Sequence, residues 1–188
     1  MGVKRILWES LPTLMLVTII TVFAGFLLNS ALSIGNVVGI LIITPAIIGT
    51  GGDIGTSFGA RITTQLHSGL IEPRFRRYRL VYVNFIALLA CGILVSVLIG
   101  FTGYGVGALL EYYNPTTSLG LSLGDYLLIA LAAGTIEYLA ILVISLLIAF
   151  ISFRRGLDPD NLVAPLVTTL ADLIGIAAIF LILHLAII

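Results

Sequence analysis

Long apolar runs separated by short polar segments dominate the chain, and they predict five membrane-spanning helices. A helix needs roughly 20 apolar residues to cross the hydrocarbon core of a bilayer, and each run reaches that length. We therefore expect an all-α integral membrane protein. The predicted spans are residues 11–32, 36–67, 80–101, 123–150 and 162–187, with residues 102–122, rich in glycine and tyrosine, as a loop.

The second run is far less uniform than the others. Between Thr44 and Ser57 it contains a proline, four glycines and Asp53, a composition that predicts a helix broken within the membrane. Discontinuous helices of this kind mark ion and substrate sites in transporters. We expect this segment to line water along its inner half.

The positive residues predict the orientation of the five spans. Lys4 and Arg5 precede the first span, four arginines occur within residues 74–79, and Arg154 and Arg155 lie between the last two spans. Since cytoplasmic loops are enriched in Lys and Arg, five spans place every cluster on one side. The pattern predicts a cytoplasmic N-terminus and an external C-terminus.

Composition narrows the function classes. The 188 residues are 60% hydrophobic and 10% charged, with a formal net charge of zero. This composition indicates a multi-pass protein of the cell membrane with the lipid bilayer as a partner, and the lack of a basic helix argues against nucleic acid. No HExxH or GxSxG motif occurs, so we do not expect an enzyme.

Three acids, Asp53, Glu137 and Asp172, are predicted at comparable depth on three different spans. A carboxylate at the bilayer centre costs about 2.5–3.5 kcal/mol on insertion scales, which favours a functional interpretation. Each also has a structural alternative. Asp53 could cap a helix that restarts after the glycine pair, and Glu137 could be protonated or paired with Arg61.

Asp172 lies near the middle of the last predicted span. On a helix, Thr168, Thr169, Asp172 and Gly175 recur at spacings of three and four residues and form one polar stripe. Pro165, one turn earlier, can free a backbone carbonyl. Carboxylate, hydroxyl and carbonyl oxygens suit a hard cation such as Mg²⁺.

An acidic segment from Asp158 to Asn161 precedes this span. One interpretation makes Asp160 or Asn161 the N-cap of the helix. The other makes Asp160 part of a peripheral cation site.

Two motifs in this chain fall in a familiar order and spacing. The first is residues 45–64, with a Gly-Gly-Asp and a later Gly-Ala-Arg-Ile-Thr-Thr; the second is residues 158–161, Asp-Pro-Asp-Asn, followed by Pro165 and residues 168–173. Together they resemble the MgtE family of magnesium and divalent cation transporters, especially its eukaryotic solute-carrier relatives. The similarity covers nearly the whole chain.

The resemblance implies a divalent-cation pathway at a two-fold axis between two five-helix bundles, with Asp172 matching the family's ion-coordinating aspartate. It also implies a homodimer, or a heterodimer with a second MgtE-like half. Bacterial members carry cytoplasmic regulatory domains, which we do not expect here because residues 1–188 form a single transmembrane domain. Asp53 departs from the asparagine that many members have after the glycine pair.

We therefore expect transport of a divalent cation, magnesium above others, through a pore whose narrowest part is formed by Asp172 from two chains. The alternatives are a non-conducting membrane scaffold, against which the three acids argue, and a proton- or sodium-coupled divalent cation carrier. The predicted cation-binding residues are Asp172, Asp53, Glu137, Thr168, Thr169, Gly52 and Asp160.

Overall fold

The computed structural model describes residues 3–32, 38–74, 76–114 and 120–186, and its regular elements are five α-helices. Each helix is long and apolar enough to cross a membrane, which confirms the five predicted spans and a multi-pass membrane protein. The helices are α1 Val3–Leu32, α2 Val38–His67, α3 Arg79–Tyr113, α4 Leu123–Arg154 and α5 Pro159–Ala186.

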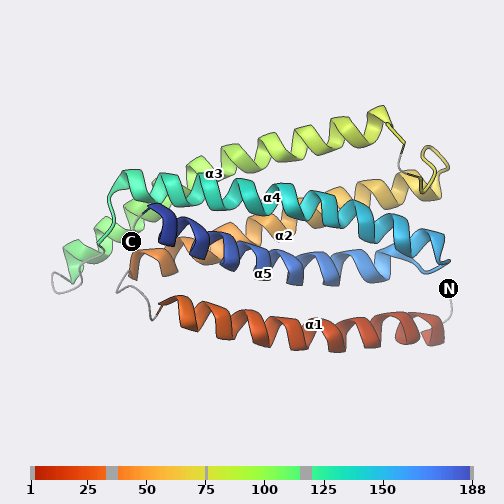
Figure 1. Cartoon of the computed structure of the whole chain (residues 1–188), viewed down its shortest axis with the longest axis horizontal. Helices are drawn as coiled ribbons and strands as arrows, with labels where there is room; N and C mark the ends of the chain where they lie inside the picture. Colours follow the sequence, from red (N-terminus) through yellow and green to blue (C-terminus); the bar gives the residue numbers. More distant parts are fainter. Residues whose placement is uncertain (1–2, 33–37, 75, 115–119, 187–188) are drawn as a thin grey trace.

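Three helices, α2, α4 and α5, pack on one another and form the centre of the bundle. α3 lies against α2 and α4 on one side, and α1 contacts only α5 on the other (Figure 1). Successive helices run in opposite directions, so the two chain ends lie at opposite ends of the bundle. α5 thus contacts α1 as well as the other two central helices, α2 and α4.

The basic clusters lie at one end of the bundle, as the five-span arrangement requires. The N-terminus, the α2–α3 connection and the α4–α5 connection are found together at the right of Figure 1. These segments carry eight of the nine Lys and Arg residues, and the ninth, Arg61, is in the half of α2 toward the same end. That this end is cytoplasmic stays a prediction of the positive-inside rule.

The break predicted between Thr44 and Ser57 is absent, because α2 is one continuous helix with Pro45 inside it. The glycines serve close packing instead. Gly51, Gly55 and Gly59 are four residues apart and share one face, a small-residue pattern that lets membrane helices approach each other closely. A Cβ on each would overlap a side chain of α4 or α5: Glu137 at Gly51, Val167 at Gly55 and Val163 at Gly59.

The loop predicted for residues 102–122 is wrong in its first half, since α3 continues to Tyr113. Gly103 and Gly107 are buried, and a Cβ on Gly103 would overlap Ile43. Glycine is common in transmembrane helices, so here it marks helix packing rather than a turn. With 35 residues, α3 is about 52 Å long, and its C-terminal end projects beyond the other helices in Figure 1.

α5 begins three residues earlier than predicted, at Pro159. Asp158, rather than Asp160 or Asn161, caps it: the Asp158 carboxylate accepts the backbone N–H of Asp160 at 3.1 Å. Proline fits the first helical position because its missing N–H would have no partner there. The N-cap predicted at Asp160 or Asn161 is therefore wrong.

The core consists of two hydrophobic clusters, one in each half of the bundle. The cluster nearer the basic end includes Phe58 and Tyr138, and the other includes Ile47 and Tyr126. Between the clusters is a layer formed by residues 48–53 of α2, 134–137 of α4 and 172–177 of α5.

Candidate cation site

The layer between the two hydrophobic clusters contains Asp53, Glu137 and Asp172, one from each central helix. The structure therefore places the three predicted acids at the same level of the bundle. Their surroundings differ, however. Glu137 is fully buried, Asp172 is half-buried and Asp53 is exposed.

Glu137 lies between α2 and α5, at positions where both helices carry glycine. A Cβ on Gly51 would overlap the Glu137 carboxyl, and one on Gly175 would lie 2.9 Å from Oε2. Neither Glu137 oxygen has a hydrogen-bond partner among the residues described. Arg61 instead donates to Asn84 at 3.0 Å, so the pairing of Glu137 with Arg61 is wrong.

Asp172 is neither fully buried like Glu137 nor exposed like Asp53. Its side chain is half-buried, and it lies three residues before Gly175, which packs against the Glu137 carboxyl. Two carboxylates in a region of low dielectric repel each other strongly unless a cation or a proton lies between them. The pair therefore favours either a proton or a cation at this level of the bundle.

Polar and small residues form the exposed stripe of α2. They recur every three or four positions, which places them along one face, and the exposed members are Gly49, Asp53, Ser57, Ala60, Arg61 and Thr64. Since α2 is continuous, Asp53 does not cap a restarted helix. Ser57 and Thr64 were not among the predicted site residues, although their four- and eleven-residue spacing from Asp53 would have identified them.

Thr168 of α5 adjoins the exposed stripe of α2. A Cβ on Gly52 would lie 3.6 Å from the Thr168 methyl group, and Thr168 itself is exposed. Its hydroxyl donates to the Ala164 and Pro165 carbonyls at 3.0 and 3.1 Å. Because the proton is used inside the helix, the oxygen lone pairs remain available to a cation or to its water.

The remaining predicted residues lie elsewhere. Thr169 is buried and donates to the Pro165 carbonyl at 3.0 Å, so it is not on the exposed side with Thr168. The Gly52 carbonyl accepts the Thr56 hydroxyl at 2.9 Å inside continuous helix, and is not the freed carbonyl that a broken helix would supply. Asp160 is in the first turn of α5, about 18 Å along the helix from Asp172.

Among the residues described, no group of three His, Cys, Asp or Glu side chains could hold a metal ion. The site that the chain offers is instead an open polar face, formed by the stripe of α2 with Thr168 and Asp172 of α5. We call this the α2–α5 face.

Comparison with known proteins assigns the chain to a class of transporter. The family model MgtE, described as a divalent cation transporter, matches residues 44–182. Solute carrier family 41 member 2 of Macaca fascicularis is 28% identical over 188 residues, covering 94% of this chain and 31% of the relative. Solute carrier family 41 member 3 of Mus musculus is 26% identical over 171 residues, covering 86% and 34%.

This chain thus spans about a third of the length of the curated relatives that it matches. No solved structure matches it. The family match includes the whole of the layer with the three acids and all of the α2–α5 face from Gly49 to Asp172.

Proposed function

This chain belongs to the MgtE family of divalent cation transporters, and we propose from that premise that it moves a divalent cation, magnesium above others, across the membrane. The pathway lies between the α2–α5 faces of two copies. The observation that carries the proposal is the exposure of Asp53, Ser57 and Thr168 at membrane depth. Lipid cannot solvate such groups, so they require water or protein in front of them.

The other helices do not cover this face. α1 contacts only α5, and α3 contacts only α2 and α4. The outward sides of α1, α3 and α4 carry large apolar residues such as Phe26, Leu94 and Val143, which suit lipid. The α2–α5 face therefore favours a second copy, or a second MgtE-like half, related by a two-fold axis.

A two-fold axis between two copies brings two of each carboxylate to the pathway. Asp172 of one copy then faces Asp172 of its partner across the pathway, and the pair matches the charge of one divalent ion. Magnesium gives up its bound water molecules reluctantly and prefers octahedral oxygen geometry at about 2.0–2.1 Å. Two facing carboxylates would hold it through those waters, while Thr168 and Asp53 supply further oxygens along the pathway.

Glu137 lies in the core, behind the proposed pathway rather than on its surface. It is fully buried, lies against Gly51 and Gly175, and has no hydrogen-bond partner among the residues described. Because it is packed between α2 and α5, we expect it to set the packing beside Asp172 rather than to contact the hydrated ion.

The test is divalent-ion flux into proteoliposomes, with magnesium compared with calcium, manganese and cobalt. We expect Asp172→Asn to lower magnesium flux by about tenfold or more, because one charge–charge interaction at 4 Å contributes about 1–4 kcal/mol. Glu72→Gln is the control: it removes one exposed carboxylate at the basic end of the bundle, and should retain wild-type flux.

Two results would contradict the proposal. Wild-type flux in Asp172→Asn would exclude this carboxylate as the filter. A complete lack of flux from the wild-type chain, in vesicles that contain folded protein, would show that the chain does not transport on its own.

A further inference from the structure

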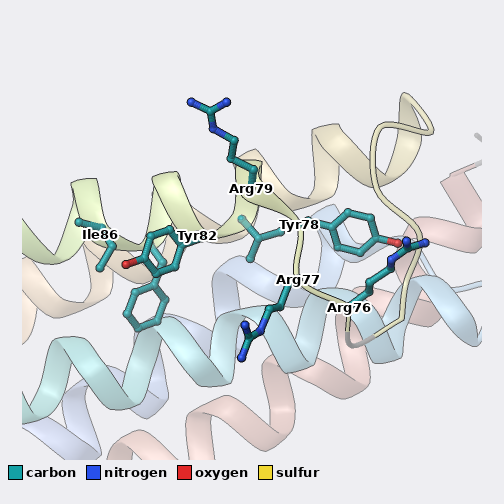
Figure 2. Close-up of a pocket in the computed structure, with 8 residues that line it drawn as sticks. Arg76, Arg77, Tyr78, Arg79, Tyr82 and Ile86 are labelled. Atoms are coloured by element: carbon teal, nitrogen blue, oxygen red, sulfur yellow. The ribbon is translucent and has the colours of Figure 1, made fainter.

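A groove of about 850 Å³ lies at the basic end of the bundle, on the flank of α3. Arginines from the α2–α3 connection and the first turn of α3 line one end of the groove, which we call its upper end. Side chains of the following turns of α3 line the rest, which we call its floor. Figure 2 shows the guanidinium groups of Arg76, Arg77 and Arg79 spread around the start of α3, with Tyr82 and Ile86 following along the helix. The groove thus has a charged end and an apolar end.

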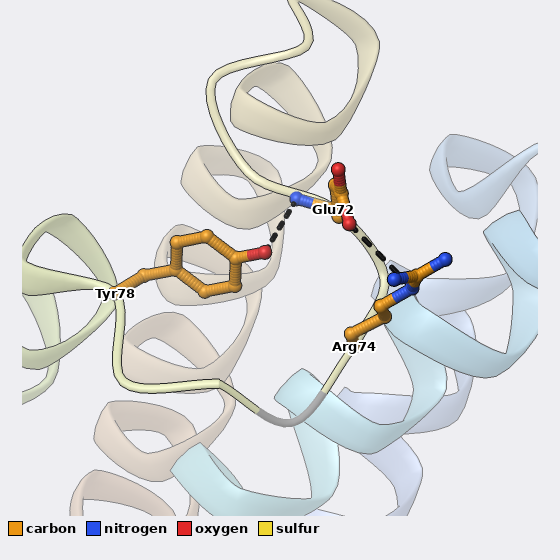
Figure 3. Close-up of polar contacts among 3 residues, drawn as sticks. All are labelled: Glu72, Arg74 and Tyr78. Carbon is orange, nitrogen blue, oxygen red and sulfur yellow. Dashed lines mark hydrogen bonds and ion pairs between the residues drawn. The ribbon is translucent and has the colours of Figure 1, made fainter.

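The charge at the upper end is not compensated within the connection. Glu72 is the one acid between residues 68 and 79, and it pairs with Arg74 at 3.5 Å (Figure 3). Arg76, Arg77 and Arg79 are exposed and form no ion pair with the residues that the structure describes. Three positive charges therefore occur within four residues, without a counter-charge in the part of the chain that the structure describes.

The start of α3 adds to this positive end. Tyr78 is the N-cap, and no side chain hydrogen-bonds to the amides of the first turn. Uncapped amides and the helix dipole favour an anion at a helix N-terminus. The Tyr78 hydroxyl accepts the backbone N–H of Glu72 at 3.2 Å (Figure 3), which fixes the connection against the helix that it precedes.

The floor of the groove is apolar and faces outward. Val81 and Phe85 are partly buried, while Tyr82 and Ile86 are 67% and 45% exposed on a membrane-spanning helix. A tyrosine at this position suits the headgroup region, where aromatic residues of membrane proteins concentrate. The groove therefore passes from the interface toward the hydrocarbon.

We propose that this groove binds one anionic phospholipid, with its phosphate at the end that Arg76, Arg77 and Arg79 make positive and an acyl chain along Val81, Phe85 and Ile86. The positive end favours an anionic headgroup over a zwitterionic one, because the zwitterionic headgroup carries no net charge. The apolar end distinguishes a lipid from a soluble anion. Basic pockets beside spanning helices have the chemistry to retain anionic headgroups.

The test is native mass spectrometry of the delipidated full chain, titrated with dioleoylphosphatidylglycerol or with dioleoylphosphatidylcholine. We expect one tightly bound phosphatidylglycerol and markedly weaker phosphatidylcholine binding. Replacing all three arginines, Arg76→Gln with Arg77→Gln and Arg79→Gln, should weaken phosphatidylglycerol binding about a hundredfold, at about fivefold per arginine.

The control is the double variant Arg154→Gln with Arg155→Gln, which removes positive charge from the same end of the bundle but outside the groove. It should retain wild-type affinity. If the triple variant does not fold, as judged by circular dichroism, the single variant Arg77→Gln and the comparison of the two lipids on wild type remain decisive.

Three results would overturn the proposal. Equal affinity of the wild-type chain for the two lipids would exclude recognition of the anionic headgroup. An equal loss in the control variant would assign binding to general surface charge. Displacement of the lipid by glycerol phosphate at matching concentration would show a soluble-anion site with no role for the apolar floor.

Discussion

Thr168 and Thr169 are neighbours in α5 that make the same kind of hydrogen bond but lie in opposite environments. Both hydroxyls donate to the Pro165 carbonyl, at 3.1 and 3.0 Å. Thr168 is exposed beside Gly52, whereas Thr169 is 2% exposed. The two residues therefore separate the contribution of a hydroxyl to the helix from its contribution to the α2–α5 face.

We predict that Thr168→Val lowers magnesium flux while Thr169→Val does not. Each substitution keeps the side-chain shape and removes the donation of the hydroxyl to the carbonyls one turn earlier. Only Thr168→Val also removes an oxygen from the proposed pathway, and the loss of one such contact, about 1 kcal/mol, corresponds to about a fivefold decrease. Proteoliposome flux measures both variants. Equal effects would show that the hydroxyl of Thr168 acts only within the helix.

A second prediction concerns the contact between Gly51 and Glu137. Gly51→Ala places a methyl group where the Glu137 carboxyl lies, so either this buried side chain or the spacing of α2 and α4 must change. Overpacking of this kind costs about 1–3 kcal/mol and should lower the thermal midpoint in detergent. Gly49→Ala is the control in the same helix, since a Cβ there meets nothing within 4 Å. A lower midpoint for Gly49→Ala alone would contradict the packing that the structure describes.

The third prediction is a gain in stability from Glu137→Met. The carboxyl is fully buried without a hydrogen-bond partner among the described residues, and an unsatisfied buried polar group costs about 1–3 kcal/mol. An apolar side chain of similar length should raise the thermal midpoint. A lower midpoint would indicate that the carboxyl has a stabilising partner in the assembled protein.

Ser96→Ala provides the comparison for Glu137→Met in the same core. Ser96 and Tyr138 form a buried hydrogen bond of 3.0 Å between α3 and α4. Its loss removes one hydrogen bond of the tyrosine hydroxyl, which also bonds Thr50, and should destabilise the protein by about 0.5–1.5 kcal/mol and lower the midpoint. The two substitutions thus have opposite expected signs.

The fourth prediction tests the pairing of two copies. Cysteine at position 57, made as Ser57→Cys in a Cys91→Ala background, should form a disulfide between copies in membranes under mild oxidation. Ser57 is exposed on the α2–α5 face, and a disulfide requires Cα atoms within about 7 Å. Leu94→Cys is the control on the lipid-facing side of α3, where Leu94 is 68% exposed. Equal crosslinking of both variants would exclude a specific α2–α5 interface.

Much of the architecture could be predicted from the distribution of apolar residues. Lipid requires long uninterrupted spans, so the number of helices and the grouping of basic clusters at one end followed from length and charge. The common level of Asp53, Glu137 and Asp172 was also predictable, because depth depends only on position along each helix. The structure confirms this level through the layer between the two hydrophobic clusters.

The sequence misled where glycine was interpreted by its behaviour in soluble proteins. Gly51 in α2 and Gly103 in α3 predicted a break and a loop, but both lie at close contacts between continuous helices. Only the neighbouring helix distinguishes these cases. The same holds for Thr168 and Thr169, since spacing alone places them on one stripe while packing buries one of them.

α1 has a consequence for how this protein can be observed. It contacts only α5, the helix that carries Asp172, and it carries Trp8, the one tryptophan of the chain, 81% exposed. The tryptophan fluorescence of the unlabelled chain therefore comes from α1, which packs on the helix that carries the proposed filter. A spectral shift on adding magnesium would report movement of α5 against α1 without any engineered probe.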